Sequence, residues 1–298
     1  MHGGVAVRCP VGMIHVVLTE RPLLLGGGGV VAEAVAEAAR PRRIAGTTRN
    51  PAAIARIAAL GIDPVLLDCR GGIELTDDLA EADVVVTFPP DGESDSQLAP
   101  QLERCRRIVY VSSTGVYGDL RGRIDNDTPA TPNDETGRRR LAAEDSWRSI
   151  GATVVRAPGI YGRGRGLHRL IASGAYRLPG DGSGVVSRIH VEDLALVLLA
   201  ALDRGAAGAT LVVGDLCAVP QRAVVAWLCD RLGREMPPSV RLEDAPRTLR
   251  GSRSVDPSGT LKALEVTLRY PTYREGFESC LESDGFGPGR VEDRDHNR

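Results

Sequence analysis

Two segments near the middle of the 298-residue chain carry hydroxyl and guanidinium groups at spacings that could serve catalysis. The first, Arg107-Ile-Val-Tyr-Val-Ser-Ser-Thr-Gly-Val-Tyr-Gly118, reads as a buried strand that ends in three hydroxyls and a Val-Tyr-Gly turn. The second runs from Thr136 to Glu144 and places Thr136 and Arg140 four residues apart, on one face of a predicted helix. A hydroxyl can hydrogen-bond a substrate oxygen, but an aliphatic alcohol is too weak an acid to donate a proton near neutral pH.

A run of four glycines lies between a predicted strand and a predicted helix. The run fits G-x-x-G-x-x-A from Gly26 and G-x-G-x-x-A from Gly27, and both patterns end at Ala32. Glycine permits positive φ and close approach of the backbone to a pyrophosphate, and the start of the following helix favours an anion. A flexible turn without a ligand is the alternative. The context favours a nucleotide-binding turn made of Gly26, Gly27, Gly28, Gly29, Val30 and Val31.

The second predicted strand ends at Gly46-Thr-Thr-Arg-Asn-Pro51, where an acidic residue would accept hydrogen bonds from the ribose of NAD. Here Arg49 stands between Thr48 and Asn50, and a guanidinium beside hydroxyl groups suits a 2′-phosphate. NADP is therefore expected as the cofactor in preference to NAD, although Arg49 could also be an exposed loop charge. Asp68, at the end of the third predicted strand, is placed to meet the adenine or to act as a turn acceptor.

Strands and helices alternate along most of the chain, which predicts an α/β fold: a doubly wound parallel sheet (Rossmann fold) with a small C-terminal substrate-binding lobe. Continuous apolar runs such as residues 84–86 fit strands buried on both faces. Predicted strands cover residues 23–25, 43–47, 64–67, 83–88, 108–112, 153–156 and 210–213. Predicted helices cover residues 30–40, 51–60, 96–106, 134–150, 191–202 and 220–232, and Thr76 caps a further short helix.

The same pattern divides the chain into four parts. They are an N-terminal extension (1–21, partly disordered), a nucleotide-binding domain (22–165 with 190–214), a substrate-binding lobe (166–189 with 215–282) and a disordered tail (283–298). A start at Met13 instead of Met1 would place the first strand near the N-terminus.

The composition, with 42% hydrophobic and 26% charged residues, is that of an ordinary globular protein. A formal net charge of −2 gives no reason to expect a nucleic acid or an anionic membrane as partner. No apolar stretch approaches the roughly 18–20 residues of a membrane span. The six cysteines show no metal-binding spacing, so a protein without a metal in a reducing, cytoplasmic location is expected, with a small molecule as its partner.

Four motifs occur in order along the chain: Gly26-x-x-Gly29-x-x-Ala32, Val111-Ser-Ser-Thr-Gly-Val-Tyr-Gly118, Arg156-Ala-Pro-Gly-Ile-Tyr-Gly162 and Arg188-Ile-His-Val-Glu-Asp-Leu-Ala195. Together with the late segment Tyr270-Pro-Thr-Tyr-Arg-Glu-Gly276, they resemble the extended and atypical short-chain dehydrogenase/reductases. The resemblance is strongest to the NAD(P)-dependent epimerase/dehydratase-like group with degenerate active sites. It covers residues 22–282 and is more specific for the fold than for a substrate.

The resemblance assigns roles to further residues. Those implied to line the cofactor are Thr87, Phe88, Pro89, Ser112, Ala157, Gly159 and Ile160. Ser113, assisted by Thr114, is implied to hydrogen-bond the substrate oxygen. Those implied to lie toward the substrate are Tyr161, Arg188 and His190.

The chain departs from the superfamily at its acid–base pair. The superfamily carries Tyr-x-x-x-Lys where this chain has Thr136 and Arg140; the tyrosine transfers the proton and the lysine lowers its pKa and binds the ribose. Thr136 cannot replace the tyrosine, whereas Arg140 can keep a ribose contact without the geometry or proton exchange of lysine. The single lysine of the chain, Lys262, is remote in sequence. Candidate replacements for the proton donor, each more often structural, are Tyr117, Tyr161 and His190.

Two functions are weighed, and non-redox chemistry on the same scaffold, with the cofactor vestigial or absent, is the remaining alternative. The first is an NADP-binding oxidoreductase or epimerase/dehydratase-like enzyme that acts on a small polar metabolite, a sugar being one candidate. The second is a catalytically degenerate NADP-binding sensor or structural protein without hydride transfer. The resemblance alone also suggests a homodimer through the predicted helices at residues 96–106 and 134–150.

Overall fold

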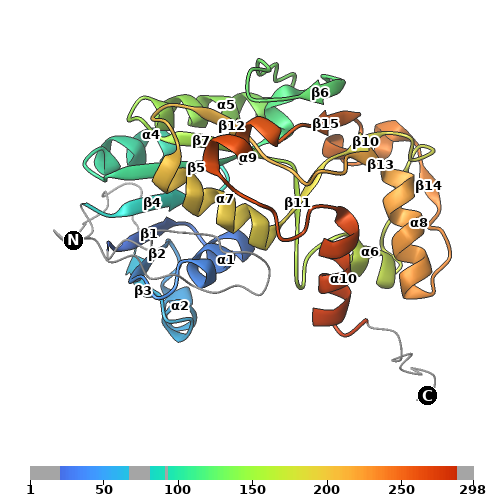
Figure 1. Cartoon of the computed structure of the whole chain (residues 1–298), viewed down its shortest axis with the longest axis horizontal. Helices are drawn as coiled ribbons and strands as arrows, with labels where there is room; N and C mark the ends of the chain where they lie inside the picture. The colour runs from blue at the N-terminus through green and yellow to red at the C-terminus, as the bar shows by residue number, and fades with distance from the viewer. Residues whose placement is uncertain (1–20, 67–80, 91–92, 287–298) are drawn as a thin grey trace.

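A computed structural model of the chain describes residues 21–66, 81–90 and 93–286. Its centre is a seven-stranded sheet in the order β12-β7-β5-β4-β1-β2-β3, with every neighbouring pair parallel (Figure 1). The strands are β1 (Leu23–Gly26), β2 (Ile44–Thr48), β3 (Asp63–Leu66), β4 (Asp83–Val86), β5 (Arg107–Ser113), β7 (Thr153–Ala157) and β12 (Thr210–Val212). The predicted parallel sheet is confirmed.

The strand order reverses between β1 and β4. From β1 the chain proceeds outward through β2 to β3, then returns to the other side of β1 with β4 and continues outward through β5 and β7 to β12. In open parallel sheets such a switch point leaves a crevice beyond the carboxyl ends of the two central strands, where ligands bind. The glycine turn that follows β1 lies at this crevice.

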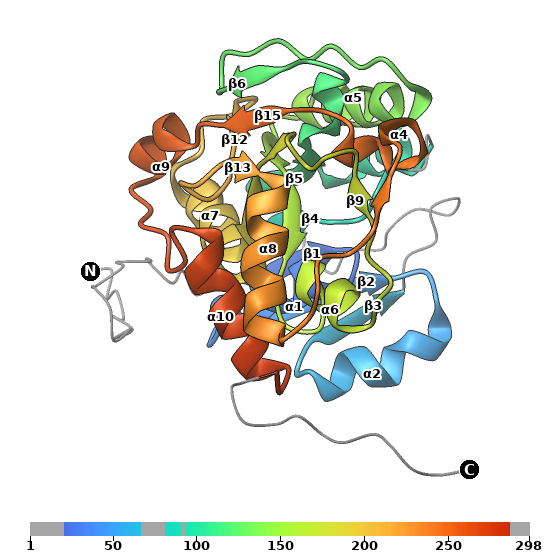
Figure 2. The ribbon, with the colours of Figure 1, turned by 90° about the vertical axis from the view of Figure 1, so that its right-hand side faces the viewer.

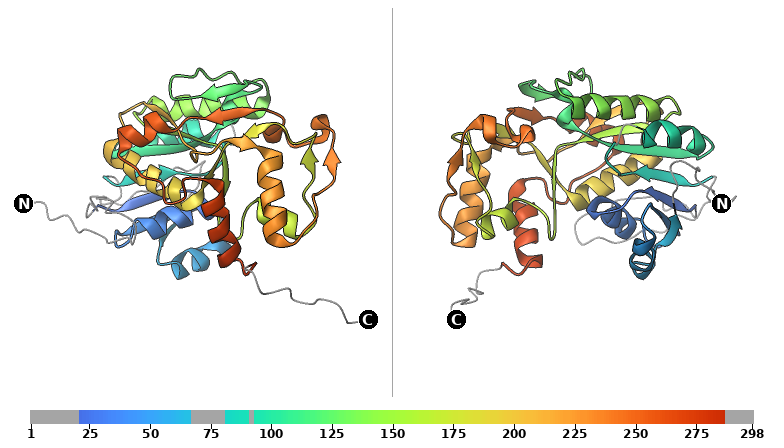
Figure 3. Two further views of the ribbon diagram at one scale, coloured as in Figure 1. Left: turned by 45° about the vertical axis from the view of Figure 1, so that its right-hand side comes forward. Right: turned by 180° about the vertical axis from the view of Figure 1, so that it is seen from behind.

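Helices cover both faces of the sheet (Figure 3). On one face α1 (Val30–Ala38) packs against α7 (Val191–Arg204), and both bury apolar side chains such as Val35 and Leu198 against the strands. On the other face α4 (Ser94–Leu98) and α5 (Glu135–Arg148) bury Leu98 and Trp147. Burial of apolar surface on both faces explains why the central strands are continuously apolar.

Two predicted helices take a different form in the structure. The helix predicted over residues 96–106 is wrong in extent, since α4 ends at Leu98 and a 3₁₀ turn, η2 (Ala99–Leu102), follows. Pro100 explains the change, because proline lacks an N–H and disfavours helical geometry in the preceding residue. The helix predicted to follow Asn50 begins as η1 (Pro51–Ala53) and continues as α2 (Ile54–Ala59). Asn50 caps this helix, because its side chain accepts a hydrogen bond from the amide of Ala52.

A second lobe stands at one end of the sheet (Figures 1 and 2). Its helices are α6 (Leu167–Ala172), α8 (Gln221–Leu232) and α10 (Tyr273–Ser283), while α9 (Ser258–Leu264) packs against α7. Its strands form three small sheets. The first has four strands in the order β13 (Val219–Pro220), β10 (Val185–Val186), β15 (Arg253–Val255) and β6 (Gly122–Ile124). The other two are pairs, β8 (Gly159–Tyr161) with β11 (Arg188–His190) and β9 (Leu178–Pro179) with β14 (Ser239–Val240). These strands are two or three residues long, too short to show a periodic pattern in sequence.

Some predictions fall on residues outside the described ranges. These are Asp68, the short helix capped by Thr76, the N-terminal extension up to residue 20 and the tail beyond Phe286. Within the described ranges no helix combines the length and the apolar character that crossing a membrane requires.

Candidate functional site

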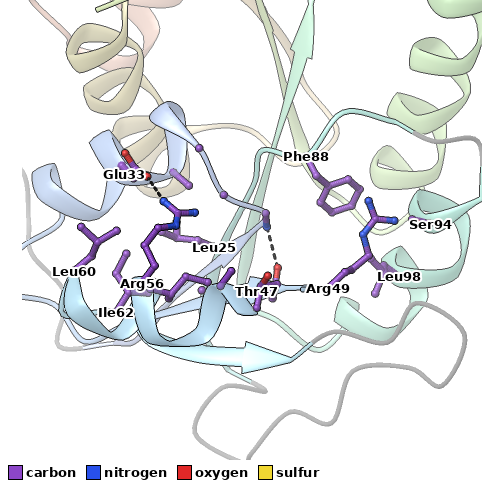
Figure 4. A pocket seen from close by; sticks show the side chains of 18 residues that line it. Leu25, Glu33, Thr47, Arg49, Arg56, Leu60, Ile62, Phe88, Ser94 and Leu98 are labelled. Carbon is purple, nitrogen blue, oxygen red and sulfur yellow. Dashed lines mark hydrogen bonds and ion pairs between the residues drawn. The ribbon is translucent and has the colours of Figure 1, made fainter. Parts of the chain in front are cut away.

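The glycine turn after β1 forms an open backbone cradle. Gly27 has a φ of +105°, and its N–H donates to Thr47 Oγ1 at 2.9 Å (Figure 4). A Cβ at Gly27 would lie 2.9 Å from the amide nitrogen of Phe88, so only glycine fits there. A Cβ at Gly28 or Gly29 would meet no atom within 4 Å, so this side of the turn faces open space. Gly29 then caps the nine-residue helix α1, which gives the turn the N–H groups and dipole that favour an anion.

A first cavity of about 220 Å³ lies beside this turn (Figure 4). Of the residues predicted to bind the cofactor, those that line it are Gly27, Gly28, Gly29, Thr48, Arg49 and Phe88. Figure 4 shows the Arg49 side chain directed toward Phe88 and Ser94. Asn50 does not line this cavity, because its side chain caps η1.

The first cavity has a second arginine that the sequence did not single out. Arg56 projects from α2, and its Nη1 donates to Glu33 Oε1 of α1 at 3.2 Å. No local pattern marked this residue, since it reaches the cavity only because α2 folds back beside the glycine turn. Arg49 and Arg56 thus approach the cavity from opposite sides (Figure 4).

A second cavity of about 520 Å³ meets the first at Gly28 and Gly29. It lies beyond the ends of β4, β5 and β7 and is closed on its far side by residues of the second lobe. The residues predicted to bind cofactor or substrate that line it are Gly28, Gly29, Val30, Val31, Thr87, Pro89, Ser112, Ser113, Thr114, Arg140, Ala157, Gly159 and Ile160. Gly26 lines neither cavity, because it is the last residue of β1 and packs against Val86.

Ser112 and Ser113 have different roles although they are adjacent. Side chains alternate between the two faces of a strand. Ser113 Oγ accepts from the amide of Gly115 at 3.1 Å, caps the turn η3 (Thr114–Tyr117) and keeps its own O–H available at the second cavity. Ser112 Oγ donates instead to the buried carboxylate of Glu144 at 2.5 Å. The hydroxyl available to a substrate is therefore that of Ser113.

The Glu144 carboxylate is the centre of a buried polar network. It accepts from Ser112, from Arg156 Nη2 at 2.7 Å and from Arg148 Nη2 at 2.5 Å. Arg156 Nη1 in turn donates to the Tyr117 hydroxyl at 3.0 Å. Tyr117 lies in an apolar cluster and lines neither cavity, and burial above all raises the pKa of its phenol. This placement gives Tyr117 a structural contact and no access to a substrate in the second cavity.

Thr136 and Arg140, which the resemblance predicts at the position of an acid–base pair, differ in their exposure to solvent. Thr136, in the first turn of α5, is exposed and lines neither cavity, whereas Arg140 is half-buried and lines the second cavity. Lys262 is exposed on α9, so it does not fold back to the site. Apart from arginines, no titratable side chain is among the described residues that line the second cavity. The site therefore presents hydroxyls and guanidinium groups but no acid of near-neutral pKa.

A third cavity of about 530 Å³ adjoins the second under the second lobe. Tyr161 and Arg188 line it, and Tyr161 stacks on Phe277 with ring centroids 4.2 Å apart. His190 lines none of the three cavities, because its Nδ1 accepts from the amide of Glu192 and caps α7. Burial, followed by the nearby Arg269, lowers the pKa of His190 to about 4. His190 is therefore neutral at physiological pH and engaged in the core.

The sheet order, the glycine turn and the cavities define a Rossmann-type nucleotide-binding protein, and the comparison with known families agrees. Residues 95–214 match the model of the NAD dependent epimerase/dehydratase family. These residues therefore carry an epimerase/dehydratase-type domain.

Individual relatives support the same placement. Protein YeeZ of Escherichia coli strain K12 is 31% identical over 180 residues, which span 53% of this chain and 64% of YeeZ, less than two thirds of that relative. The dTDP-glucose 4,6-dehydratase of Mycolicibacterium smegmatis is 27% identical over 241 residues, which span 68% of this chain and 72% of the dehydratase.

Solved structures extend the likeness over the whole fold. The structure of a functionally unknown conserved protein from Silicibacter pomeroyi DSS has a TM-score of 0.76 and 32% identity, over 89% of this chain and 99% of that protein. The dTDP-glucose 4,6-dehydratase of Bacillus anthracis, solved in complex with NAD, has a TM-score of 0.71 and 18% identity, over 90% of this chain and 98% of that enzyme. The second likeness concerns the fold alone.

Proposed function

We propose that the chain is an NADP-dependent oxidoreductase or epimerase/dehydratase-like enzyme that acts on a small polar metabolite. The observation that carries this proposal is the junction of the first two cavities at Gly28 and Gly29. Arg49 and Arg56 flank one end of the combined space, and Ser113 and Arg140 line the other. A dinucleotide in this space would have its 2′-phosphate near Arg49 and Arg56 and its nicotinamide, the reacting end, near Ser113 and Arg140.

The residues present fit such a cofactor. The glycine turn has no side chain to obstruct a pyrophosphate, and Gly27 admits no Cβ at all. Thr48, Arg49 and Arg56 would hold a 2′-phosphate, because guanidinium groups bind phosphate with charge-assisted hydrogen bonds. The backbone from Ala157 to Ile160, with Thr87 and Arg140, would surround the nicotinamide half. When bound, NADP(H) would supply or accept the hydride.

Ser113 is the residue best placed to act on the substrate. Its oxygen accepts from Gly115, so its O–H is free to donate to a carbonyl or hydroxyl oxygen in the second cavity. Arg140 would add a positive charge beside developing negative charge on that oxygen. Because the described lining residues include no acid of near-neutral pKa, the substrate would exchange its proton with water through the hydroxyl groups of the second cavity. Slow turnover is therefore expected.

Calorimetric titration with NADPH, NADP, NADH and NAD tests the cofactor assignment. We expect NADP(H) to bind more tightly than NAD(H), and Arg49→Ala and Arg56→Ala each to weaken NADP(H) about tenfold or more while changing NAD(H) little. Arg104→Ala, an exposed arginine that lines none of the cavities, is the matched control. Equal affinity for the two cofactor pairs would refute the NADP preference. Absence of binding to all four would refute the redox assignment.

A binding protein without hydride transfer is the second candidate. The exposed position of Thr136 and the lack of a near-neutral acid among the described lining residues favour it. The two functions differ in one measurement, the transfer of deuterium from 4-deuterated NADPH to a panel of aldehydes, ketones and oxo-acids under single-turnover conditions. Transfer that falls in Ser113→Ala supports the enzyme. Tight NADPH binding without transfer to any compound supports the binding protein.

A further inference from the structure

The third cavity continues the space in which the substrate of the proposed enzyme would lie. Six residues line both the second and the third cavity: Gly159, Ile160, Arg165, Val186, Ser187 and Leu249. A molecule that reacts beside Ser113 can therefore extend past Arg165 into the third cavity. The chemistry of these walls restricts what the substrate can be.

The walls carry positive charge, and no acidic side chain is among the described residues that line them. Arginine is the only charged residue type among the described residues that line the two cavities, and the five are Arg140, Arg165, Arg169, Arg188 and Arg253. Two of them have partners outside the cleft, since Arg169 pairs with Asp284 and Arg253 donates to the carbonyl of Gly118. A cleft lined by one sign of charge attracts ligands of the opposite sign.

Arg165 stands where the two cavities meet and is held by a rigid loop. The amide of Arg165 donates to the carbonyl of Gly162 at 3.0 Å, and the amide of Gly162 donates back at 2.9 Å. The intervening Gly164 amide donates to the carboxylate of Asp284, which also pairs with the buried His168 at 2.9 Å. The backbone position of Arg165 is thus fixed while its exposed side chain stays available to a ligand.

Buried donors reinforce the preference for an acceptor. Arg188 donates from Nη2 to Gln221 Oε1 at 2.8 Å, and Gln221 Nε2 donates to the Tyr176 hydroxyl at 2.9 Å. A guanidinium has only donors, so the Gln221 oxygen must face Arg188 and its amide must face Tyr176. Tyr176 therefore keeps its own O–H for a ligand in the third cavity, which it lines.

Apolar side chains form a large part of the remaining wall of the third cavity. The apolar side chains that line it include Leu167, Leu170, Leu249 and Phe277, and Leu170 is 48% exposed. An apolar wall matches a hydrocarbon, whereas a nucleoside or a sugar would need hydrogen-bonding partners along it.

We propose that the small metabolite of the proposed function is polar at its acidic end and apolar in its body: its carboxylate or phosphate group binds Arg165 and its hydrocarbon part lies in the third cavity. The claim that this acid reacts in the second cavity rests on the proposed function, whereas the claim that it binds Arg165 does not. Arg165 is a substrate-binding residue in this proposal, and Tyr176 supplies a second donor.

Calorimetry with hexanoate, hexyl phosphate, hexanamide and UDP-glucose tests the proposal on the full chain. We expect hexanoate or hexyl phosphate to bind, the tighter of the two identifying the head group, and the neutral isostere hexanamide to bind at least about tenfold more weakly. Arg165→Ala should weaken the acid at least about tenfold. Arg163→Ala, two residues earlier in the same loop, exposed and outside all three cavities, should leave its affinity unchanged.

Three results would overturn the proposal. They are equal binding of hexanoate and hexanamide, unchanged acid binding in Arg165→Ala, and UDP-glucose binding through Arg165 more tightly than either acid. Arg49→Ala distinguishes this inference from the cofactor assignment, because an acid that bound in the first cavity would lose affinity in that variant instead. The titrations need no nucleotide, so failure of the NADP assignment leaves their outcome interpretable.

Discussion

The buried carboxylate of Glu144 gives a quantitative test of what holds the site together. Glu144→Gln keeps the shape of the side chain and an oxygen for Ser112, but it removes the negative charge between Arg156 and Arg148. The amide would also oppose an N–H donor to a guanidinium that can only donate. The variant therefore leaves a charged group in the interior without its counterion.

The structure sets the size of the effect. Arg148 is 24% exposed and also pairs with Asp145, so it can find water and a second partner. Arg156 is 5% exposed and stays buried, with only the Tyr117 hydroxyl as a further partner. Removing one member of a buried pair costs about 3–5 kcal/mol, and with one of two arginines able to relax we expect about 3 kcal/mol. For a chain of this size that corresponds to a fall in Tm of about 6–12 °C.

Thermal unfolding followed by circular dichroism measures this change. Asp145→Asn is the matched control. The Asp145 carboxylate also pairs with Arg148 but is 69% exposed, so it should contribute at most about 1 kcal/mol to the free energy of unfolding. A Glu144→Gln variant that melts within about 2 °C of the wild type would refute the reasoning. In that case Arg156 would have to be neutralised or solvated by a route that the network does not contain.

Three further outcomes are expected. Tyr117→Phe should lower the free energy of unfolding by about 1 kcal/mol in urea titration and leave NADPH affinity unchanged, because it removes one hydrogen bond from Arg156; a loss of turnover at unchanged stability would contradict this. Gly276→Ala should destabilise by about 1–3 kcal/mol relative to the exposed Glu282→Ala, since its Cβ would lie 2.0 Å from the Tyr161 hydroxyl oxygen. Burial raises the pKa of Asp215 from 3.8 to about 7 against the opposing effect of Arg188, with Asp193 and Glu275 also raising it. Its contribution to stability is thus complete below pH 3.8 and is lost as the pH rises through about 7, by up to about 4 kcal/mol. Asp215→Asn should flatten that part of the pH–stability profile, and an unchanged profile would count against the assignment.

Local chemistry made most elements predictable. The strands around β1, β4 and β5 were evident as short apolar runs, and Asp134 marks the start of α5 because its carboxylate accepts from the amide of Gly137. The 96–106 helix was overestimated because Pro100 lies inside an otherwise helical composition. The paired strands of the second lobe escaped prediction because each depends on a partner distant in sequence.

The candidate site also contains residues that local sequence predicts and residues that only tertiary contacts place. The glycine turn and Ser113 are local features, since one needs glycine at a close backbone approach and the other ends a buried strand. The position of the Tyr117 side chain could not be predicted from local sequence. Its hydroxyl is placed by Arg156 and its ring by a surrounding apolar cluster, and both come from distant parts of the chain.

The sequence by itself determined the parallel sheet, and it predicted the glycine turn as a phosphate-binding turn and Thr136 and Arg140 as replacements of a tyrosine–lysine pair, because periodicity, glycine spacing and residue identity are properties of contiguous segments. Only the tertiary structure decided that Thr136 is exposed, that Arg56 joins Arg49 at the first cavity, and that Arg165 stands between the second and third cavities. Cavity walls are assembled from strand ends and loops that are far apart along the chain. Their charge and shape follow from how the two lobes pack, which no local pattern records.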